Sequence, residues 1–327
     1  MHMRNRNSIC VLVFAAAMLQ AQQPGTVAGP SAGFVFDNSQ HVLRGIRGIP
    51  GATLIGDSVD FGFQPAWVSV APSLDSALAA DAQGTVHLFQ LNGTKAVERP
   101  IDGLVAGQQA IFSPTGSAAA LFGSGSVQLL KGLPGAPSIA GTLPLSGDFS
   151  SRVGAAAVRG SRRSTGAPLA VSDDGGYILL ASGGGIRILG ASGDNRQLVA
   201  ATAGTLAAFA PGNHDVAVAD PENGLSLIQD AAGASVSKSL ASPGGLPEAV
   251  AFSPDGQTIF VASAAAKNVA AFAIASGTST TLACDCTPAG LTRMGNVFRL
   301  NEFGNGPIWL LDAKAGDPRL VFVPAMK

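Results

Sequence analysis

The residues in this chain that could perform acid–base or metal chemistry are sparse and scattered. Three histidines lie beyond the first two residues: His41, His87 and His214. No two are close in sequence, and none has the His-x-His or His-Glu-x-x-His spacing that brings two imidazoles onto one metal. We interpret His87, in "TVHLFQL", as a strand-face residue, and His214, next to Asp215, as the start of a second strand. Zinc catalysis has no support in the sequence.

Paired carboxylates can hold a metal or act as acid and base, and two such clusters are visible. Asp173 and Asp174 lie in "VSDDGG", and Asp220 and Glu222 lie in "DPENG". Each cluster precedes a glycine, where a short carboxylate accepts hydrogen bonds from the backbone of its own turn. A calcium loop of alternating aspartates that ends in glutamate is missing. We therefore interpret both clusters as turns.

Other catalytic and cofactor motifs are also missing from the sequence. There is no Gly-x-Ser-x-Gly nucleophile elbow. The glycine-rich stretches "GSGS" at 123–126 and "SGGGI" at 182–186 lack the lysine and the following helix of a phosphate loop. Trp67 and Trp309 are the only tryptophans, so the tryptophan-bearing repeats of quinone-dependent dehydrogenases are not present. We predict no catalytic, metal-binding or cofactor-binding residue and no cofactor.

Two cysteines remain once the first residues are set aside: Cys284 and Cys286, in "LACDCTP". Neither has the further cysteine or histidine neighbours that structural zinc needs. Two interpretations stay open. The pair could form a local disulfide in an oxidising compartment, or it could be two buried thiols, because residues two apart in a strand seldom meet disulfide geometry.

An arginine-containing segment at 146–167 interrupts the rest of the pattern. It holds Arg152, Arg159, Arg162 and Arg163 among glycine, serine and alanine. Guanidinium groups recognise carboxylate and phosphate, so this segment is the candidate partner-binding loop. The simpler interpretation is a surface loop whose charges keep it solvated.

The composition favours many short strands and excludes several classes of partner. Charged residues make up 13% of the chain, against about 25% in typical soluble domains, while 42 of the 327 residues are glycine and the mean hydropathy is +0.32. With 20 basic and 21 acidic residues, no net field would attract nucleic acid or anionic lipid. Beyond residue 20 every apolar run ends before the 18 residues that a spanning helix requires.

The first residues have the pattern of a secretory signal peptide. Arg4 and Arg6 precede an apolar run from Ile9 to Leu19, and the small residue Ala21 follows. The alternative is an uncleaved anchor, although the run is shorter than the ~20 residues needed to span a bilayer. We predict a signal peptide at 1–21, a linker at 22–32, and a periplasmic or secreted protein.

A repeat of about 40 residues determines the predicted fold. "FSPDG" at 252–256 recurs as "FSPTG" at 112–116, with looser copies at 70–74, 171–175 and 209–213. In the best copy, which begins at residue 249, an alternating apolar strand, an Asp-Gly turn and the strand "TIFVAS" are followed by "NVAAFAIA" and then "STTLACD". Four strands per ~40 residues is the unit of a β-propeller blade.

The stretch "AFSPDGQTIFVAS" resembles the opening of a blade in bacterial propeller repeats of the YVTN and WD40-like kind. The resemblance covers about residues 65–327 and is strongest at 249–290. The Gly-His and Trp-Asp dipeptides of WD40 proteins are absent, and "FVAS" stands where YVTN would be. The resemblance implies a fold but no function.

We therefore predict an all-β protein: one β-propeller of four-stranded antiparallel blades over 33–327. Six blades begin near residues 65, 108, 168, 205, 247 and 289, and the N-terminal piece at 33–64 supplies a seventh that packs against the last blade. The alternative has six blades, with an N-terminal strand pair shared into the closure. A sandwich or a solenoid would not keep this period.

The function favoured by these observations is an exported, non-catalytic binding or scaffold module. Its partner would be a protein, a peptide or a glycan, and the protein itself a monomer. The competing class is a metal-dependent hydrolase of the propeller lactonase type, in which carboxylate and asparagine oxygens hold a metal in the central channel. Inward-facing carboxylates would favour the hydrolase, and a channel lined with alanine, serine and valine would count against it.

Overall fold

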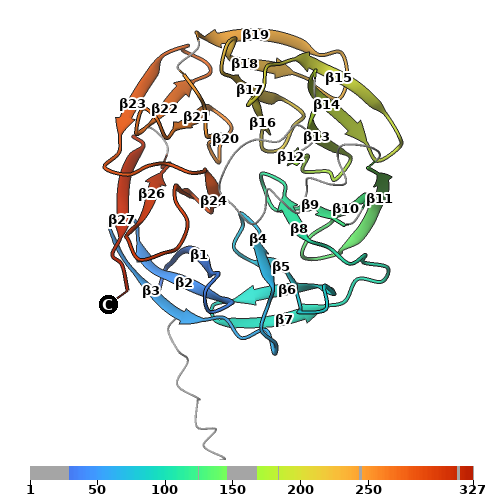
Figure 1. The fold of residues 1–327 in the computed structure, drawn as a ribbon, viewed down its shortest axis with the longest axis vertical. Coiled ribbons are helices and arrows are strands. Elements are labelled where there is room, and N and C mark those ends of the chain that lie inside the picture. Colours follow the sequence, from blue (N-terminus) through green and yellow to red (C-terminus); the bar gives the residue numbers. More distant parts are fainter. Residues whose placement is uncertain are drawn as a thin grey trace, which may run out of the picture.

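The chain forms a ring of seven small antiparallel sheets around a central axis (Figure 1). The computed structural model describes residues 29–123, 125–145, 168–182, 184–242, 245–314 and 317–326. The expected signal peptide lies outside them. The predicted seven-bladed propeller is confirmed, and the six-bladed alternative is not what the structure shows. Within the described residues, no helical segment has the length and apolarity that crossing a bilayer demands.

Each blade follows the chain outward from the axis. Blade 1 contains β1 (Ser31–Asp37), β2 (Val42–Ile49) and β3 (Ala52–Ser58). Blade 2 contains β4 (Trp67–Val70), β5 (Ser76–Ala80), β6 (Val86–Asn92) and β7 (Lys95–Arg99). Blade 3 contains β8 (Gln109–Phe112), β9 (Ala118–Phe122), β10 (Ser126–Lys131) and β11 (Ser138–Pro144). Blade 4 contains β12 (Pro168–Val171), β13 (Tyr177–Ser182), β14 (Gly185–Gly190) and β15 (Asn195–Ala200).

The remaining three blades repeat this order. Blade 5 contains β16 (Leu206–Phe209), β17 (Val216–Asp220), β18 (Gly224–Gln229) and β19 (Val236–Ala241). Blade 6 contains β20 (Ala249–Phe252), β21 (Thr258–Ser263), β22 (Asn268–Ala273) and β23 (Ser279–Ala283). Blade 7 contains β24 (Thr292–Met294), β25 (Val297–Arg299), β26 (Ile308–Asp312) and β27 (Arg319–Val323). Neighbouring strands are antiparallel, so the turns after first strands share one face of the ring, and the turns after second strands share the other.

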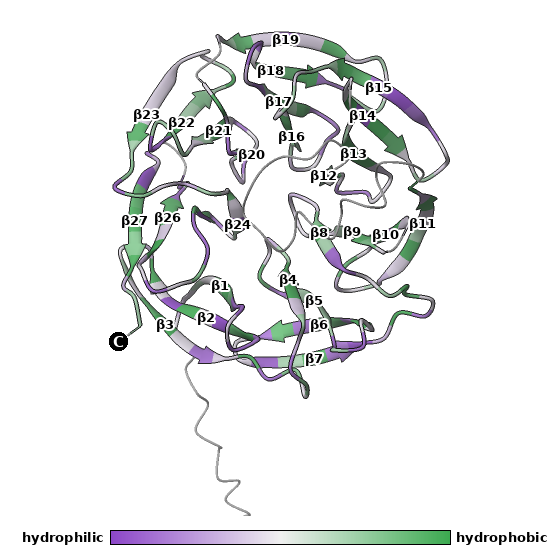
Figure 2. Cartoon of the chain, in the orientation of Figure 1, coloured by the Kyte–Doolittle hydropathy of each residue, from purple (hydrophilic) through white to green (hydrophobic). Residues whose placement is uncertain are grey.

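Burial falls from the middle of each blade to the rim. Every residue of β5, β9 and β17, the second strands of their blades, is buried. The outermost strands β7 and β23 are mostly exposed. In Figure 2 the second and third strands are mostly green, whereas the turns and the outer strands mix purple, white and green. The core therefore lies between the faces of adjacent blades, as stacked sheets require.

The turn after the first strand explains why "FSPDG" recurs. In blade 6, Ser253 Oγ donates to Asp255 Oδ1 at 2.5 Å and accepts from the backbone N–H of Thr258 at 2.9 Å. Gly256 has φ +71°, where side chains are strained. Ser172, Asp174 and Gly175 make the same kind of turn in blade 4. The "FSPDG" sequence therefore recurs because its serine, aspartate and glycine form the hydrogen bonds and backbone of this turn.

Blade 1 differs from the other six because only three of its strands are described. Asp37, at the end of β1, accepts from the N–H groups of the next turn, as Asp81 does after β5 in blade 2. This places β1 at the position of a second strand and β3 on the rim, where Figure 1 shows it between β27 and β7. The position of an innermost strand is unfilled among the described residues.

The neighbours of blade 1 close this gap. The N–H of Gly295, in the β24–β25 turn of blade 7, donates to Pro72 O of blade 2 at 2.7 Å. Met294 is buried against Gly33 of β1, and Leu74 packs beside the same cluster. Blade 1 lies against the last blade, as predicted. The inner circle therefore has six described strands and the outer circle seven.

Candidate functional site: the central channel

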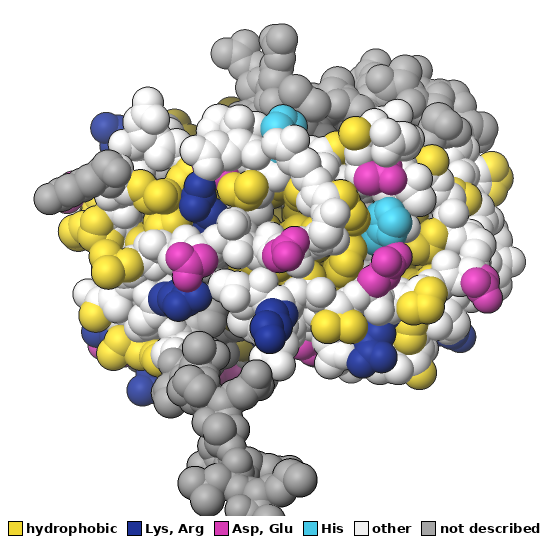
Figure 3. All heavy atoms as spheres, turned by 90° about the horizontal axis from the view of Figure 1, so that it is seen from below, with side chains coloured by type: hydrophobic (Ala, Val, Ile, Leu, Met, Phe, Trp, Pro, Cys, Tyr) yellow, Lys and Arg dark blue, Asp and Glu magenta, His cyan; other side chains and the backbone are white. Residues whose placement is uncertain are grey.

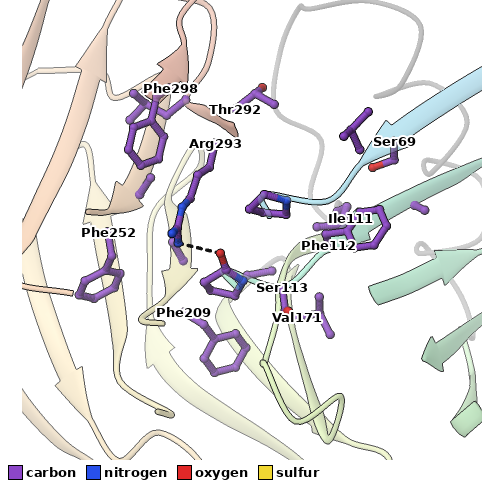
Figure 4. A pocket seen from close by; sticks show the side chains of 18 residues that line it. Ser69, Ile111, Phe112, Ser113, Val171, Phe209, Phe252, Thr292, Arg293 and Phe298 are labelled. Carbon is purple, nitrogen blue, oxygen red and sulfur yellow. Dashed lines mark hydrogen bonds between the residues drawn. The ribbon is translucent and has the colours of Figure 1, made fainter. Parts of the chain in front are cut away.

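The channel at the ring axis is walled by the six innermost strands, β4, β8, β12, β16, β20 and β24. It encloses a cavity of about 350 Å³. Most of its wall is alanine, valine, isoleucine, leucine, proline and phenylalanine. Ser69, Ser113, Thr292 and Arg293 supply the polar side chains, and Figure 4 shows them around the hollow. No carboxylate or histidine lies in the described wall.

Arg293 is the charged group of this wall. It lies on β24 at the position that Ala251 fills on β20 and Ala208 fills on β16, each one residue before the end of its strand. Its guanidinium crosses the channel from blade 7 to blade 3, where Nη1 donates to Pro114 O at 2.7 Å (Figure 4). Nε donates to Gly295 O at 3.0 Å. Burial lowers the pKa of Arg293, and the charge of Asp173 partly offsets this shift.

The paired aspartates of blade 4 are turn residues, as expected, and they also join neighbouring blades. Asp173 accepts hydrogen bonds from Thr115 of blade 3 at 2.8 and 2.6 Å and from the N–H of Gly212 of blade 5 at 2.7 Å. Burial raises the pKa of Asp174, but hydrogen bonds from Ser172, Gly176 and His214 lower it by a larger amount. The pKa therefore lies below its usual value. Neither carboxylate lines the cavity.

Asp220 and Glu222 lie on the opposite face, in the turn between β17 and β18. Asp220 is buried and accepts from Thr205 Oγ1 at 2.6 Å, from the N–H of Thr202 at 2.8 Å and from the N–H of Glu222 at 2.8 Å. Burial raises the pKa of Asp220, yet these bonds together hold it well below its usual range. The "DPENG" cluster is therefore a turn in which the Asp220 carboxylate is already hydrogen-bonded.

The three histidines do not meet. His87 Nδ1 lies 2.7 Å from Glu98 Oε1, between the third and fourth strands of blade 2. His214 Nε2 lies 3.0 Å from Asp174 Oδ2, which connects blade 5 to blade 4. His41 lies in the β1–β2 turn. In the described part of the chain, no group of three or more histidine, cysteine or acidic residues could hold a metal.

Two further sequence predictions have different outcomes. Cys284 and Cys286 form a disulfide after β23, so the bridged alternative is the one that the structure has. Arg152, Arg159, Arg162 and Arg163 fall outside the described residues, and their proposed role in partner binding remains a prediction. The segment that carries them joins β11 to β12.

Arg293 was not among the residues predicted from the sequence. Its signal was present: "LTRMGN" opens blade 7, and an arginine stands there at a first-strand position where other copies have alanine, isoleucine or serine. Finding it required the register of the divergent last repeat, which has no "SPDG" to anchor an alignment.

Comparison with known proteins supports the fold and no particular activity. No family model and no curated protein matches the chain. A functionally unknown protein from Desulfotomaculum acetoxidans matches with a TM-score of 0.55 and 14% identity, over 90% of this chain and 99% of the other. Hydrazine synthase from Kuenenia stuttgartiensis has a TM-score of 0.49 and 12% identity, covering 94% and 99%. A putative 6-phosphogluconolactonase from Bacteroides uniformis has 0.49 and 15%, covering 78% and 81%. At its low identity the first match supports the fold alone, and the other two, with TM-scores below 0.5, support no conclusion.

Proposed function

We propose that this protein is an exported binding module whose channel and ring faces receive a partner, and that it does not perform hydrolysis. The observation that carries the proposal is the described channel wall. Its described lining includes alanine, serine, valine and phenylalanine but no carboxylate that could hold a metal, and its charged group is the cation Arg293. A wall of this kind can bind and orient a ligand, but it offers no general base and no oxygen cage for a divalent ion.

The competing hydrolase is tested directly by a lactonase assay. Purified mature protein should hydrolyse a sugar lactone no faster than buffer does, with or without added calcium, magnesium or manganese. Proton release at constant pH measures the rate. Metal-stimulated turnover that is lost when Arg293 is replaced by glutamine would establish channel-centred catalysis and refute the binding proposal.

The partner class that we propose is a protein, a peptide or a glycan held on a ring face. Basic and acidic side chains are interspersed on the part of the rim shown in Figure 3, so this part of the rim offers no single-sign surface to a polyanion. We propose the arginine segment at 146–167 as the docking loop. Changing its four arginines to serine should weaken partner binding at least severalfold in surface plasmon resonance, and unchanged affinity would remove the segment from the site.

We also propose that the blades are YVTN or WD40-like repeats. Support comes from the shared serine, aspartate and glycine turn of blades 4 and 6, in which the same hydrogen bonds recur. Sequences of relatives provide the test. They should keep Ser253, Asp255 and Gly256 more often than the exposed positions of the same blade.

Export is a proposal supported by two features. The charged and apolar pattern of residues 1–21 is typical of a signal peptide. The Cys284–Cys286 disulfide suits an oxidising compartment. Cell fractionation with N-terminal sequencing tests this: the mature protein should begin near Gln22 and should be found in the periplasm or the medium. A cytoplasmic protein that keeps residues 1–21 would contradict it.

A further inference from the structure

The charge of Arg293 is not balanced by an ion pair in the described channel. Within the described residues, no acidic oxygen lies in ion-pair range of its guanidinium, and the two acceptors that it uses are the neutral carbonyl oxygens of Pro114 and Gly295. Asp173 is near enough to influence it, but that carboxylate already accepts three hydrogen bonds from Thr115 and Gly212. A partly buried charge without an ion-pair partner costs free energy, and a guanidinium cannot avoid this cost by losing its proton. A bound anion would balance the charge and remove the cost.

The remaining donors of Arg293 are held in a fixed direction. Its Nη1 and Nε are anchored on opposite sides of the channel, by blade 3 and by its own blade. No described acceptor is bonded to Nη2. The equivalent positions on β16 and β20 are the small residues Ala208 and Ala251, which leave space beside the guanidinium. The group is therefore pre-oriented, which reduces the entropy cost of binding.

The rest of the cavity wall determines which kind of anion fits, because it contacts the part of the ligand that carries no charge. Phe209, Phe252 and Val171 border it beside Arg293 (Figure 4) but are almost fully buried between the blades, and its partly exposed apolar side chains are those of Val70, Ile111, Phe112, Ala208 and Ala251. The volume of about 350 Å³ is within the range of small-molecule sites. Ser113 is committed to its own turn, where its Oγ accepts from the N–H of Ala118. Ser69 and Thr292 supply the remaining polar side chains of the described wall, and a peptide or a sugar would bring more polar groups than these two hydroxyls can pair. A phosphate dianion would need a second cation.

We infer that the central channel binds an organic monocarboxylate with an apolar body, whose carboxylate lies against Arg293. One guanidinium balances one carboxylate, and the aliphatic or aromatic body fills the space between the phenylalanine and alanine side chains. The inference goes beyond the proposed partner class, because it places a small molecule in the channel while a ring face receives the protein, peptide or glycan. It rests on the proposed function, because the channel must hold this ligand without converting it.

Binding of octanoate and of 1-octanol to the mature protein tests the inference by isothermal titration calorimetry. The wild type should bind one octanoate and should prefer it to octanol, which has the same chain without the charge. Arg293→Gln should weaken octanoate binding about tenfold or more, the usual worth of a charged hydrogen bond in free energy, and should remove the preference. Arg187→Gln is the matched control, because Arg187 lies on β14 and bonds to Asn195 away from the channel.

A second variant keeps the test decisive if Arg293→Gln does not fold. Ala251→Phe leaves the guanidinium in place and fills the adjacent space, so it should abolish octanoate binding, whereas Ala251→Ser should retain it. Equal affinity of the wild type for octanoate and octanol, or full octanoate binding by Arg293→Gln or Ala251→Phe, would overturn the inference. If octanoate fails to bind while lactone hydrolysis stays at background, the carboxylate site alone is refuted. Lactone turnover would instead refute the proposed function.

Discussion

Blade 6 and blade 1 both pack between two neighbouring blades, but they do so with different numbers of strands. Blade 6 has four strands and the complete serine, aspartate and glycine turn, and its buried Phe260 packs edge-on against Phe298 of blade 7, with ring centroids 5.6 Å apart. Blade 1 has three described strands, and side chains of its two neighbours occupy the place of the innermost one. The comparison indicates that a blade is specified by its second and third strands, while the innermost strand can be replaced by packing from outside.

The largest expected effect comes from the core of the complete blade. Phe260→Ala removes an almost fully buried ring between blades 6 and 7, so it should lower the free energy of unfolding by about 3–5 kcal/mol. Urea unfolding followed by circular dichroism measures it. Phe322→Ala, on the half-exposed rim of blade 7, is the matched control and should cost far less. Similar losses in the two variants would mean that the blade interface is not the principal core.

A smaller effect should come from the substitute packing of blade 1. Gly33 has φ +148°, and a Cβ built there would lie 2.5 Å from Met294 Sδ. Gly33→Ala should therefore cost about 1–3 kcal/mol from backbone strain plus the clash. Met294→Ala alone should cost about 2–5 kcal/mol, because it empties a buried site. The double variant should lose less than the sum of the two single losses, because the clash at Gly33 is then absent.

The double-mutant cycle tests whether Met294 fills the position of the missing innermost strand in blade 1. Strictly additive losses would show that Met294 does not fill the place of the missing strand. The control is Gly29→Ala, since a Cβ at Gly29 would meet nothing within 4 Å. It should leave stability within about 0.5 kcal/mol of the wild type.

The same two blades show how far sequence reasoning could go. Blade 6 was predicted nearly strand for strand, because its apolar alternation and its "SPDG" turn are local signals that depend on few distant contacts. Blade 1 was recognised as a blade, but not as one without a described innermost strand, because that feature depends on Met294, which is far away in sequence. Arg293 was missed for the same reason: what makes it distinctive is the apolar wall that five other blades supply.

The smallest expected effect compares one turn position in the two blades. Asp37 of blade 1 is buried and accepts from the N–H groups of Ser39 and Gln40 at 3.0 and 3.1 Å. Ser263 occupies the corresponding place in blade 6 and accepts from the N–H of Ala266 at 3.2 Å. Asp37→Ala should cost about 1–2 kcal/mol, and Ser263→Ala about 0.5–1 kcal/mol, because more and charge-assisted bonds are lost in blade 1.

The two variants should also differ in their response to pH. Burial raises the pKa of Asp37, but the bonds from Ser39 and Gln40 and the charge of Arg44 lower it by more, so the folded pKa lies below the unfolded value. The stabilisation is therefore fully present above the unfolded pKa and is lost as the pH falls through the folded one. Unfolding curves from pH 7 to pH 3 should show the gap between wild type and Asp37→Ala narrowing below about pH 4, while the gap for Ser263→Ala stays constant. A pH-independent gap for Asp37→Ala would mean that its carboxylate charge contributes nothing to the closure of blade 1.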